Sequence, residues 1–480
     1  MTTAKSSLGG GIWVTVSRVL AQLIQFVIFM VAARILQPAE FGIFALVAAV
    51  IVFLNQLAIA GWSEYILNWQ GEVARLRHAL FVACVAGALL AVAGLVMSLP
   101  IAMLFEQPNA APLARILSMS VFFAAVASAY AGVLIWQHKL AASAICPLLG
   151  EVVNLAVAIP ALLSGQGIMA LAYGRLAGAV VFCLSAVAIA RVAPAIAPQR
   201  SIYHEIGHYS WNITLTRLLS AARAYGATLI VGGLMGPAAV GYYRAAQRVI
   251  GAFEEIVSEP VRVLTWSFFR KLPRSEPTHA TFGPAADRFF PILIYASAPL
   301  FVGIAIMADD LVRGILGPDW DAAVPVVQIL SIAALIRASG TASIPILSLV
   351  GKVKLLPRYM LIYAVVTLVC IAVGAMFGLI ATAVSEVVAA LAVFAISAKI
   401  MQHHTGMRWT YIFAASWPAL PALALSIAVP LVADRYELLT QIHPLLRFLM
   451  LGVAMIIVYL PTLTLCDRTL WSRLSGRDSG

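Results

Sequence analysis

Arginine residues recur in two long stretches, residues 209–235 and 239–262, each long enough to cross a membrane as a helix. About 20 helical residues span the hydrocarbon core. One arginine at the centre of a lipid-facing helix costs about 2.5–3.5 kcal/mol, so four would cost on the order of 10 kcal/mol. We therefore expect these side chains to face protein or a water-filled cavity. Guanidinium groups hold phosphate oxygens through paired donors, so phosphate or diphosphate binding is the chemistry they suit.

A fifth arginine joins this set because Arg18 matches Arg217 in an internal repeat of the chain. The alternative is that neighbouring carboxylates, such as Glu254, Glu255 and Glu259, neutralise the arginines in ion pairs that lock helices together. Both uses stay open on the sequence alone. The candidate diphosphate-binding residues are Arg18, Arg217, Arg223, Arg244 and Arg248.

Carboxylates at membrane depth form the second group of chemical interest. A carboxylate there can exchange a proton and so couple transport to a gradient of H⁺ or Na⁺. Salt bridges between helices are an equal alternative, with Arg175 as the partner of Glu151 and Arg337 as the partner of Glu386. The candidates for ion coupling are Glu151, Glu255 and Glu386.

The stretch from His204 to His208 reads His-Glu-Ile-Gly-His and matches the H-E-x-x-H pattern of zinc proteases. A zinc site needs a third ligand and one helical face that carries both histidines. Gly207, with Pro194 and Pro198 just upstream, favours the start of a helix at the membrane interface instead. The sequence also lacks a nucleotide-binding glycine pattern and a nucleophile elbow. We expect no catalytic residues, no metal, no cofactor and no enzyme activity.

The elements that position these side chains follow from the composition. Hydrophobic residues make up 62% of the 480 residues and charged residues 11%, with a mean hydropathy of +0.97. This composition excludes a soluble globular protein and predicts an all-α polytopic membrane protein with about fourteen transmembrane helices. The predicted spans are residues 11–35, 41–61, 79–104, 111–136, 141–163, 168–192, 209–235, 239–262, 289–307, 324–350, 357–377, 379–401, 410–432 and 446–465.

The distribution of Lys and Arg residues predicts the orientation. Most of those in loops fall on one side of the membrane when both termini are placed in the cytoplasm, as the positive-inside rule requires. These loops also explain the formal net charge of +11, so we expect no nucleic acid as a partner.

The chain carries a sparse internal repeat. A shift of 199 positions superposes Thr15 on Thr214, Arg18 on Arg217, Leu20 on Leu219, Pro38 on Pro237, Ala39 on Ala238 and Gly42 on Gly241. Six helices separate the two copies, so both begin on the same side of the membrane and the repeat is parallel. Transporters built from such repeats hold the substrate between the halves and expose it by rocking one half against the other.

Residues 33–42, 232–248 and 314–325 resemble the loose consensus of a known family at corresponding helix junctions. The family is the oligosaccharide flippases, the polysaccharide-transporter branch of the multidrug/oligosaccharidyl-lipid/polysaccharide exporter superfamily. The resemblance implies two pseudo-symmetric six-helix bundles around a central cavity, residues 1–200 and 201–408. Residues 409–480 would add two transmembrane helices and a cytoplasmic tail.

The resemblance also implies a function. A flippase of this kind translocates undecaprenyl-diphosphate-linked oligosaccharide from the cytoplasmic to the periplasmic leaflet of the bacterial inner membrane. It works by alternating access, for O-antigen (lipopolysaccharide), capsule or exopolysaccharide biosynthesis, and other polysaccharide-assembly proteins are candidate partners. Four aromatic residues near the charged helices are candidates for stacking on sugars, namely Tyr225, Tyr242, Tyr243 and Trp266. The alternatives are a multidrug or cation antiporter of the same superfamily and a glycan polymerase or ligase of the same pathway.

Overall fold

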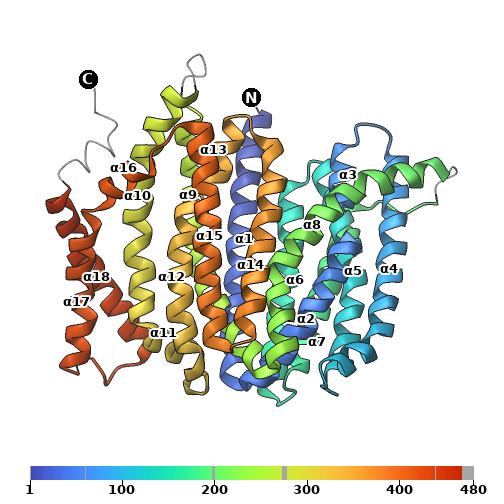
Figure 1. Ribbon diagram of the computed structural model, residues 1–480. Coiled ribbons are helices and arrows are strands. Elements are labelled where there is room, and N and C mark those ends of the chain that lie inside the picture. The colour runs from blue at the N-terminus through green and yellow to red at the C-terminus, as the bar shows by residue number, and fades with distance from the viewer. Residues whose placement is uncertain (1, 60, 197–199, 273–277, 438, 468–480) are drawn as a thin grey trace. The chain divides into compact units, whose positions relative to one another are not determined.

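The computed structural model describes residues 2–59, 61–196, 200–272, 278–437 and 439–467, and within these ranges it holds helices and loops but no strand (Figure 1). Contacts between Cα atoms divide the chain into two compact units, Met1–Gly241 and Tyr242–Gly480. The predicted all-α class is confirmed.

The described part of the first unit forms eight helices. They are α1 (Thr2–Ile35), α2 (Pro38–Ile59), α3 (Trp62–Asn68), α4 (Val73–Leu104), α5 (Ala110–Trp136), α6 (Leu140–Leu163), α7 (Met169–Ala190) and α8 (Arg200–Met235). Helix α5 packs against α4, α7 and α2, while α6 packs against α7 and α1. Helix α8 packs chiefly along α2, with α3 and α4 as its further neighbours.

Helix α9 (Pro237–Phe269) begins in the first unit and continues into the second. The helices that follow are α10 (Thr278–Ile306), α11 (Ala308–Ile315), α12 (Val324–Gly340), α13 (Ser343–Leu349), α14 (Leu356–Ala375), α15 (Leu379–Thr405), α16 (Trp409–Ser416), α17 (Ala419–Arg435) and α18 (Pro444–Cys466), with 3₁₀ turns η1 (Pro318–Ala323) and η2 (Val353–Leu355). Helix α15 packs against α14 and α12, and α12 packs against α10.

Twelve helical stretches in the described residues are long and apolar enough to cross a membrane. The pair α16 and α17, bent by 44°, is a thirteenth. Helix α9 corresponds to the remaining predicted span, and its charged residues, including Arg244, Arg248, Glu254 and Glu255, explain why it lacks an apolar window of that length. The predicted number of about fourteen therefore agrees with the structure.

Small residues bring neighbouring helices together, as expected where lipid removes the hydrophobic drive for helix association. A Cβ atom on Gly150 of α6 would lie 2.8 Å from the carbonyl oxygen of Gly178 on α7. In return, a Cβ on Gly178 would lie 2.6 Å from the carbonyl oxygen of Gly150. The two backbones meet so closely that glycine is required on both sides.

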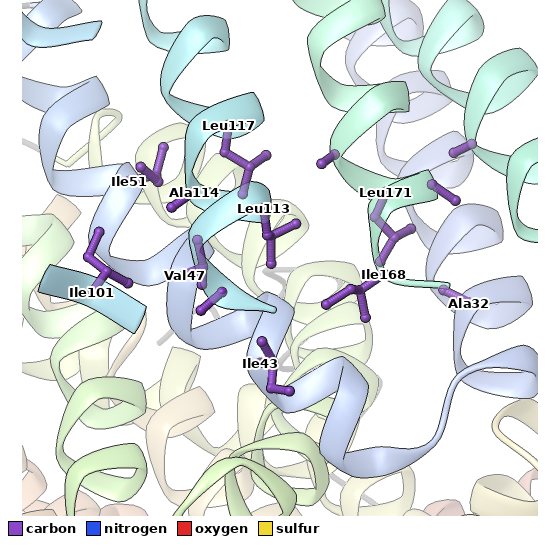
Figure 2. Packing of buried hydrophobic residues seen from close by; sticks show 14 of the residues in the cluster. Ala32, Ile43, Val47, Ile51, Ile101, Leu113, Ala114, Leu117, Ile168 and Leu171 are labelled. Carbon is purple, nitrogen blue, oxygen red and sulfur yellow. The ribbon is translucent and has the colours of Figure 1, made fainter. Parts of the chain in front are cut away.

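Figure 2 shows the core of the first unit, where α2 meets α5 and the start of α7. Ile43 and Val47 of α2 point towards Leu113 of α5, and Ile168 with Leu171 lies beside them. Buried aliphatic side chains of this kind fix the long helices against one another at close-packed density.

The second unit carries an aromatic core and secures its last two helices at both ends. Phe269, Phe282 and Phe290 are buried together beside Trp409. Tyr459 of α18 donates a hydrogen bond to the carbonyl of Tyr295 in α10 at 3.0 Å. Helices α17 and α18 therefore belong to the packed body of this unit.

Two ion pairs hold the other end of α18. Arg447 of α18 pairs with Asp310 of α11 at 3.1 Å and also with Asp434 of α17. A Cβ on Gly314 of α11 would lie 2.6 Å from the backbone nitrogen of Leu445, so α11 and α18 are in close backbone contact there. One guanidinium thus connects three helices.

Candidate transport site

Helix α9 presents three polar side chains on consecutive turns near its start. Tyr243, Arg244 and Gln247 are at spacings of three and four residues, which place Tyr243 above Gln247 on one helical face. Arg244 donates a hydrogen bond from Nη1 to Oε1 of Gln247 at 3.1 Å. Gln247 accepts this bond through its amide oxygen, and its NH₂ group donates to a carboxylate on another helix.

This carboxylate belongs to Glu386 of α15, which is only 6% exposed. Its Oε1 accepts from Nε2 of Gln247 at 2.9 Å and from the hydroxyl of Tyr243. Its Oε2 accepts from Nη1 of Arg337 on α12 at 3.2 Å. Three donors from two other helices therefore compensate the burial of this charge, as a buried carboxylate requires.

Arg337 forms ion pairs with two carboxylates. Its Nη2 lies 2.7 Å from Oε1 of Glu254 on α9, and its Nε donates to the same oxygen at 2.8 Å. The remaining Nη1 binds Glu386. We call Tyr243, Arg244, Gln247, Glu254, Arg337 and Glu386 the α9 network. Two guanidinium groups and two carboxylates balance its formal charge.

The guanidinium groups are the part of the α9 network that can bind an anion. An anion at Arg244 would compete with the amide oxygen of Gln247. An anion at Arg337 would compete with the carboxylates of Glu254 and Glu386.

The structure answers one question that the sequence left open. The alternative pairing of Glu386 with Arg337 is present, and Glu254 also takes part in it. Tyr243 is 0% exposed and points its hydroxyl at Glu386, so its ring does not face a sugar. Gln247 was not predicted as a site residue, although its position four residues after Tyr243 was a visible signal.

Arg217 lies in the first unit and pairs with Glu64 of α3. Its side chain is 30% exposed, and the second carboxylate oxygen of Glu64 is buried with no hydrogen-bond partner among the described residues. The hydroxyl of Tyr209, two turns before Arg217 on α8, approaches the backbone carbonyl of Glu64 at 3.5 Å. The alternative of an arginine held in an ion pair is therefore present for Arg217, with Glu64, a carboxylate that was not predicted as a partner.

The other predicted arginines differ in their surroundings. Arg18 on α1 and Arg223 on α8 are exposed, and Arg248 on α9 is half-buried. Arg18, Arg217 and Arg223 belong to the first unit, whereas Arg244 and Arg248 belong to the second. Of these arginines, Arg244 is a member of the α9 network through its hydrogen bond to Gln247.

The remaining carboxylate candidates are Glu151 and Glu255. Glu151 of α6 accepts from Nε2 of Gln25 on α1 at 2.9 Å and from Nδ2 of Asn154 at 3.2 Å. Arg175, its alternative partner, is exposed on α7 and is not among the donors to Glu151 in the described residues. Glu255 is exposed on α9.

The His-Glu-Ile-Gly-His segment lies in the first turns of α8. Its carboxylate, Glu205, pairs with Arg75 and accepts from the hydroxyl of Tyr65 at 2.9 Å. The rings of His204 and His208 stack with centroids 6.4 Å apart. In the part of the chain that the structure describes, no three His, Cys, Asp or Glu side chains form a group suited to a metal ion.

The fold defines a class of protein, the polytopic α-helical membrane proteins. A family model described as "Polysaccharide biosynthesis protein" matches residues 31–325, more than half of the chain. The chain belongs to this polysaccharide biosynthesis family.

Comparison with individual proteins agrees with this family. The chain is 24% identical over 466 residues to the succinoglycan biosynthesis transport protein ExoT of Rhizobium meliloti (strain 1021), which covers 96% of this chain and 93% of ExoT. Among solved structures it is similar to the lipid II flippase MurJ in an inward closed conformation, with a TM-score of 0.76 and 13% identity over 97% of this chain and all of that one. An inward-facing multidrug resistance MATE family transporter follows at a TM-score of 0.64 and 15% identity, over 80% of this chain and 95% of that one. The fold is therefore that of the flippase and multidrug exporter superfamily.

Proposed function

We propose that this protein is a flippase that moves undecaprenyl-diphosphate-linked oligosaccharide from the cytoplasmic to the periplasmic leaflet of the bacterial inner membrane. The product would enter O-antigen, capsule or exopolysaccharide assembly. The observation that carries the proposal is the family membership of residues 31–325. The similarity to a succinoglycan transport protein along 96% of the chain supports a saccharide cargo.

The cationic side chains within the helices support a diphosphate as the recognised group. Arg244 is a half-buried member of the α9 network, and Arg18 and Arg223 are exposed on α1 and α8. A guanidinium stays charged at any physiological pH and binds phosphate oxygens through two parallel donors. We assign diphosphate binding to Arg18, Arg217, Arg223, Arg244 and Arg248.

The carboxylates Glu151, Glu255 and Glu386 are the proposed sites of coupling to H⁺ or Na⁺. Glu386 has the strongest claim because it shares the α9 network with Arg244, through Gln247. The proposal also places both termini in the cytoplasm. Residues 1–200 and 201–408 would form the two bundles that rock in alternating access, with residues 409–480 as the addition.

The test is complementation of a strain from which the gene has been deleted. Lipid-linked oligosaccharide should accumulate in the inner leaflet of that strain, and the wild-type gene should restore surface glycan. Arg244→Ala should fail to restore it while reaching the membrane in normal amounts. Arg435→Ala, which removes an exposed arginine at the end of α17, is the matched control and should restore export.

Two outcomes would reject the proposed function. Normal glycan export in the deletion strain would remove the lipid-linked saccharide as cargo. Resistance to cationic dyes conferred by the wild-type gene, without any change in glycan, would instead favour the multidrug antiporter alternative.

A further inference from the structure

The sequence Pro-Ala-x-x-Gly occurs twice at the start of a helix, once in each copy of the internal repeat. In α2 it covers residues 38–42, and in α9 it covers residues 237–241. Proline suits the first position of a helix because its missing N–H would have had no partner there. The role of the two glycines becomes clear only in three dimensions.

The two segments cross each other with almost no space between their backbones. A Cβ atom on Gly42 would lie 1.8 Å from the carbonyl oxygen of Pro237. A Cβ atom on Gly241 would lie 1.9 Å from the carbonyl oxygen of Pro38. Real Cβ contacts are never this short, so each glycine is required by the backbone of the opposite helix. All four residues belong to the first unit.

The crossing is reciprocal. Gly42 contacts Pro237, and Gly241 contacts Pro38, the residue that matches Pro237 in the repeat. Reciprocal contacts of this kind arise where equivalent surfaces meet on a two-fold axis. For a parallel repeat, that axis runs along the membrane normal, which is also the direction in which cargo must cross. A backbone contact on the axis obstructs passage along it at that level.

The loops next to the crossing identify the side of the membrane. The α1–α2 connection consists of Leu36 and Gln37, and the α8–α9 connection is Gly236 alone, with a φ of 81°. Neither carries a basic residue, whereas the proposed cytoplasmic loops are rich in them. The positive-inside rule therefore assigns this end to the periplasmic side.

We propose that the Gly42–Gly241 crossing is the periplasmic gate of the transporter. The inference rests on the alternating-access function proposed above. With the crossing formed, the axis is closed at the periplasmic end, and release of the cargo on that side requires α2 and the first turn of α9 to separate. Because Gly236 is the only residue between α8 and α9, the end of α8 must move together with the first turn of α9.

The location of the α9 network gives this gate a connection to the cargo. Tyr243, two residues after Gly241 on the same continuous helix, donates its hydroxyl hydrogen bond to Glu386. Displacement of the first turn of α9 would therefore pull on a partner of that carboxylate. The hydrogen bond of Tyr243 to Glu386 and the opening of the crossing are therefore mechanically linked through one helical turn.

Cross-linking tests the gate directly. In a variant free of the five native cysteines, Ala39→Cys and Ala238→Cys place thiols at equivalent positions beside the two glycines. A short bifunctional thiol reagent that joins them should stop glycan export, and a reducible form of the reagent should restore it on reduction. Unchanged export in fully cross-linked protein would show that the helices do not separate and would overturn the gate.

Alanine substitution supplies a second measurement that does not depend on the cargo. Val240, beside the crossing, is 0% exposed, so Val240→Cys should react slowly with a membrane-impermeant maleimide. Gly42→Ala should force the helices apart and make the labelling faster. Gly251→Ala, on the same helix α9 and with no atom within 4 Å of its added Cβ, is the matched control and should leave the rate unchanged. Equal labelling in all three backgrounds would reject the crossing as a gate.

The two readouts separate this inference from the proposed function. If the cargo is not a lipid-linked saccharide, the glycan assay fails in every variant, but the maleimide rates still differ between Gly42→Ala and Gly251→Ala. If only the gate is wrong, wild-type export is normal and the fully cross-linked protein exports glycan at the same rate. Normal membrane content and a cooperative thermal transition in each variant show that the comparison is made on folded protein.

Discussion

Single residues in the α9 network illustrate how charge is tolerated inside a membrane protein. Glu386 is buried to 6% exposure, yet each of its oxygens accepts at least one hydrogen bond. Arg337 is the residue on which this arrangement depends, because it alone in the described contacts neutralises both Glu254 and Glu386. Removing one partner of a buried ion pair is far more costly than replacing the whole pair by apolar residues.

Arg337→Ala should therefore destabilise the protein. We expect a loss of about 3 kcal/mol, the lower end of the range for broken buried pairs, because Arg337 and Glu254 are 27% and 30% exposed. Thermal unfolding in detergent measures the effect. The control is Arg313→Ala, which removes exposed pairs with Asp309 and Asp321 and should cost under about 1 kcal/mol.

A companion variant shows whether the lost charge balance is the cause. Addition of Glu386→Gln to Arg337→Ala removes the stranded carboxylate and should recover part of the lost stability. Equal stability of Arg337→Ala and Arg313→Ala would instead mean that the α9 network contributes nothing to folding.

At the scale of elements, the ion pairs of Arg447 that join α11, α17 and α18 predict that the stability of the protein depends on pH. Burial raises the pKa of the Asp310 carboxyl above its ordinary value of 3.8, although Arg447 opposes this shift. The folded protein therefore binds a proton at Asp310 more readily than the unfolded chain does. A raised folded-state pKa contributes stability that is present at low pH and lost as the pH rises through it.

Comparison of the wild type with Asp310→Asn isolates this contribution. As the pH falls from about 7 through this raised pKa towards 3.8, the apparent melting temperature of the wild type should improve relative to that of the variant, which cannot titrate at residue 310. Melting curves of both proteins at a series of pH values provide the measurement. A constant difference across the series would contradict the prediction.

The sequence predicted the helices well where apolar length defines them and less well at their ends. Helix α8 was expected from residue 209 but begins at Arg200, because a hydropathy pattern does not follow a helix once it leaves the apolar layer. The expected span 324–350 is broken between α12 and α13, and the span 410–432 is bent next to Pro418. Proline at residue 418 was a visible signal for that bend.

The candidate site was predictable in its residue types but not in its pairings. Arginines and carboxylates at membrane depth stand out in any hydropathy profile, so Arg244, Arg337 and Glu386 were all found. The hydrogen bonds from α9 to α15 join residues about 140 positions apart, and no local pattern encodes such a contact. The pairing of Arg217 with Glu64 was missed for the same reason.

At the scale of the whole molecule, the first unit is not complete until α8 and the first turn of α9 have joined it. A Cβ on Gly232 of α8 would lie 2.1 Å from Cδ2 of Leu46, so α8 covers α2 in close contact. A fragment of residues 1–196 lacks this cover, whereas a fragment of residues 1–241 retains it. We expect the longer fragment to resist proteolysis in membranes and the shorter one to be degraded.

Supplying the missing helix in trans provides the control. Co-expression of residues 197–480 should protect residues 1–196, because α8 can then pack on α2 from a separate chain. Equal degradation of the fragments 1–196 and 1–241 would mean that α8 is not needed to complete the first unit.

The packing of α8 on α2 also has a consequence for biosynthesis. About 176 residues separate the end of α2 from the end of α8, and ribosomes add roughly 5–20 residues per second. One face of α2 must therefore wait roughly 9–35 s in the membrane before the helix that packs on it has been translated. Lipid or the insertion machinery has to cover that face during this time. A shortage of membrane chaperones should therefore cause the newly synthesised chain to misfold first at α2.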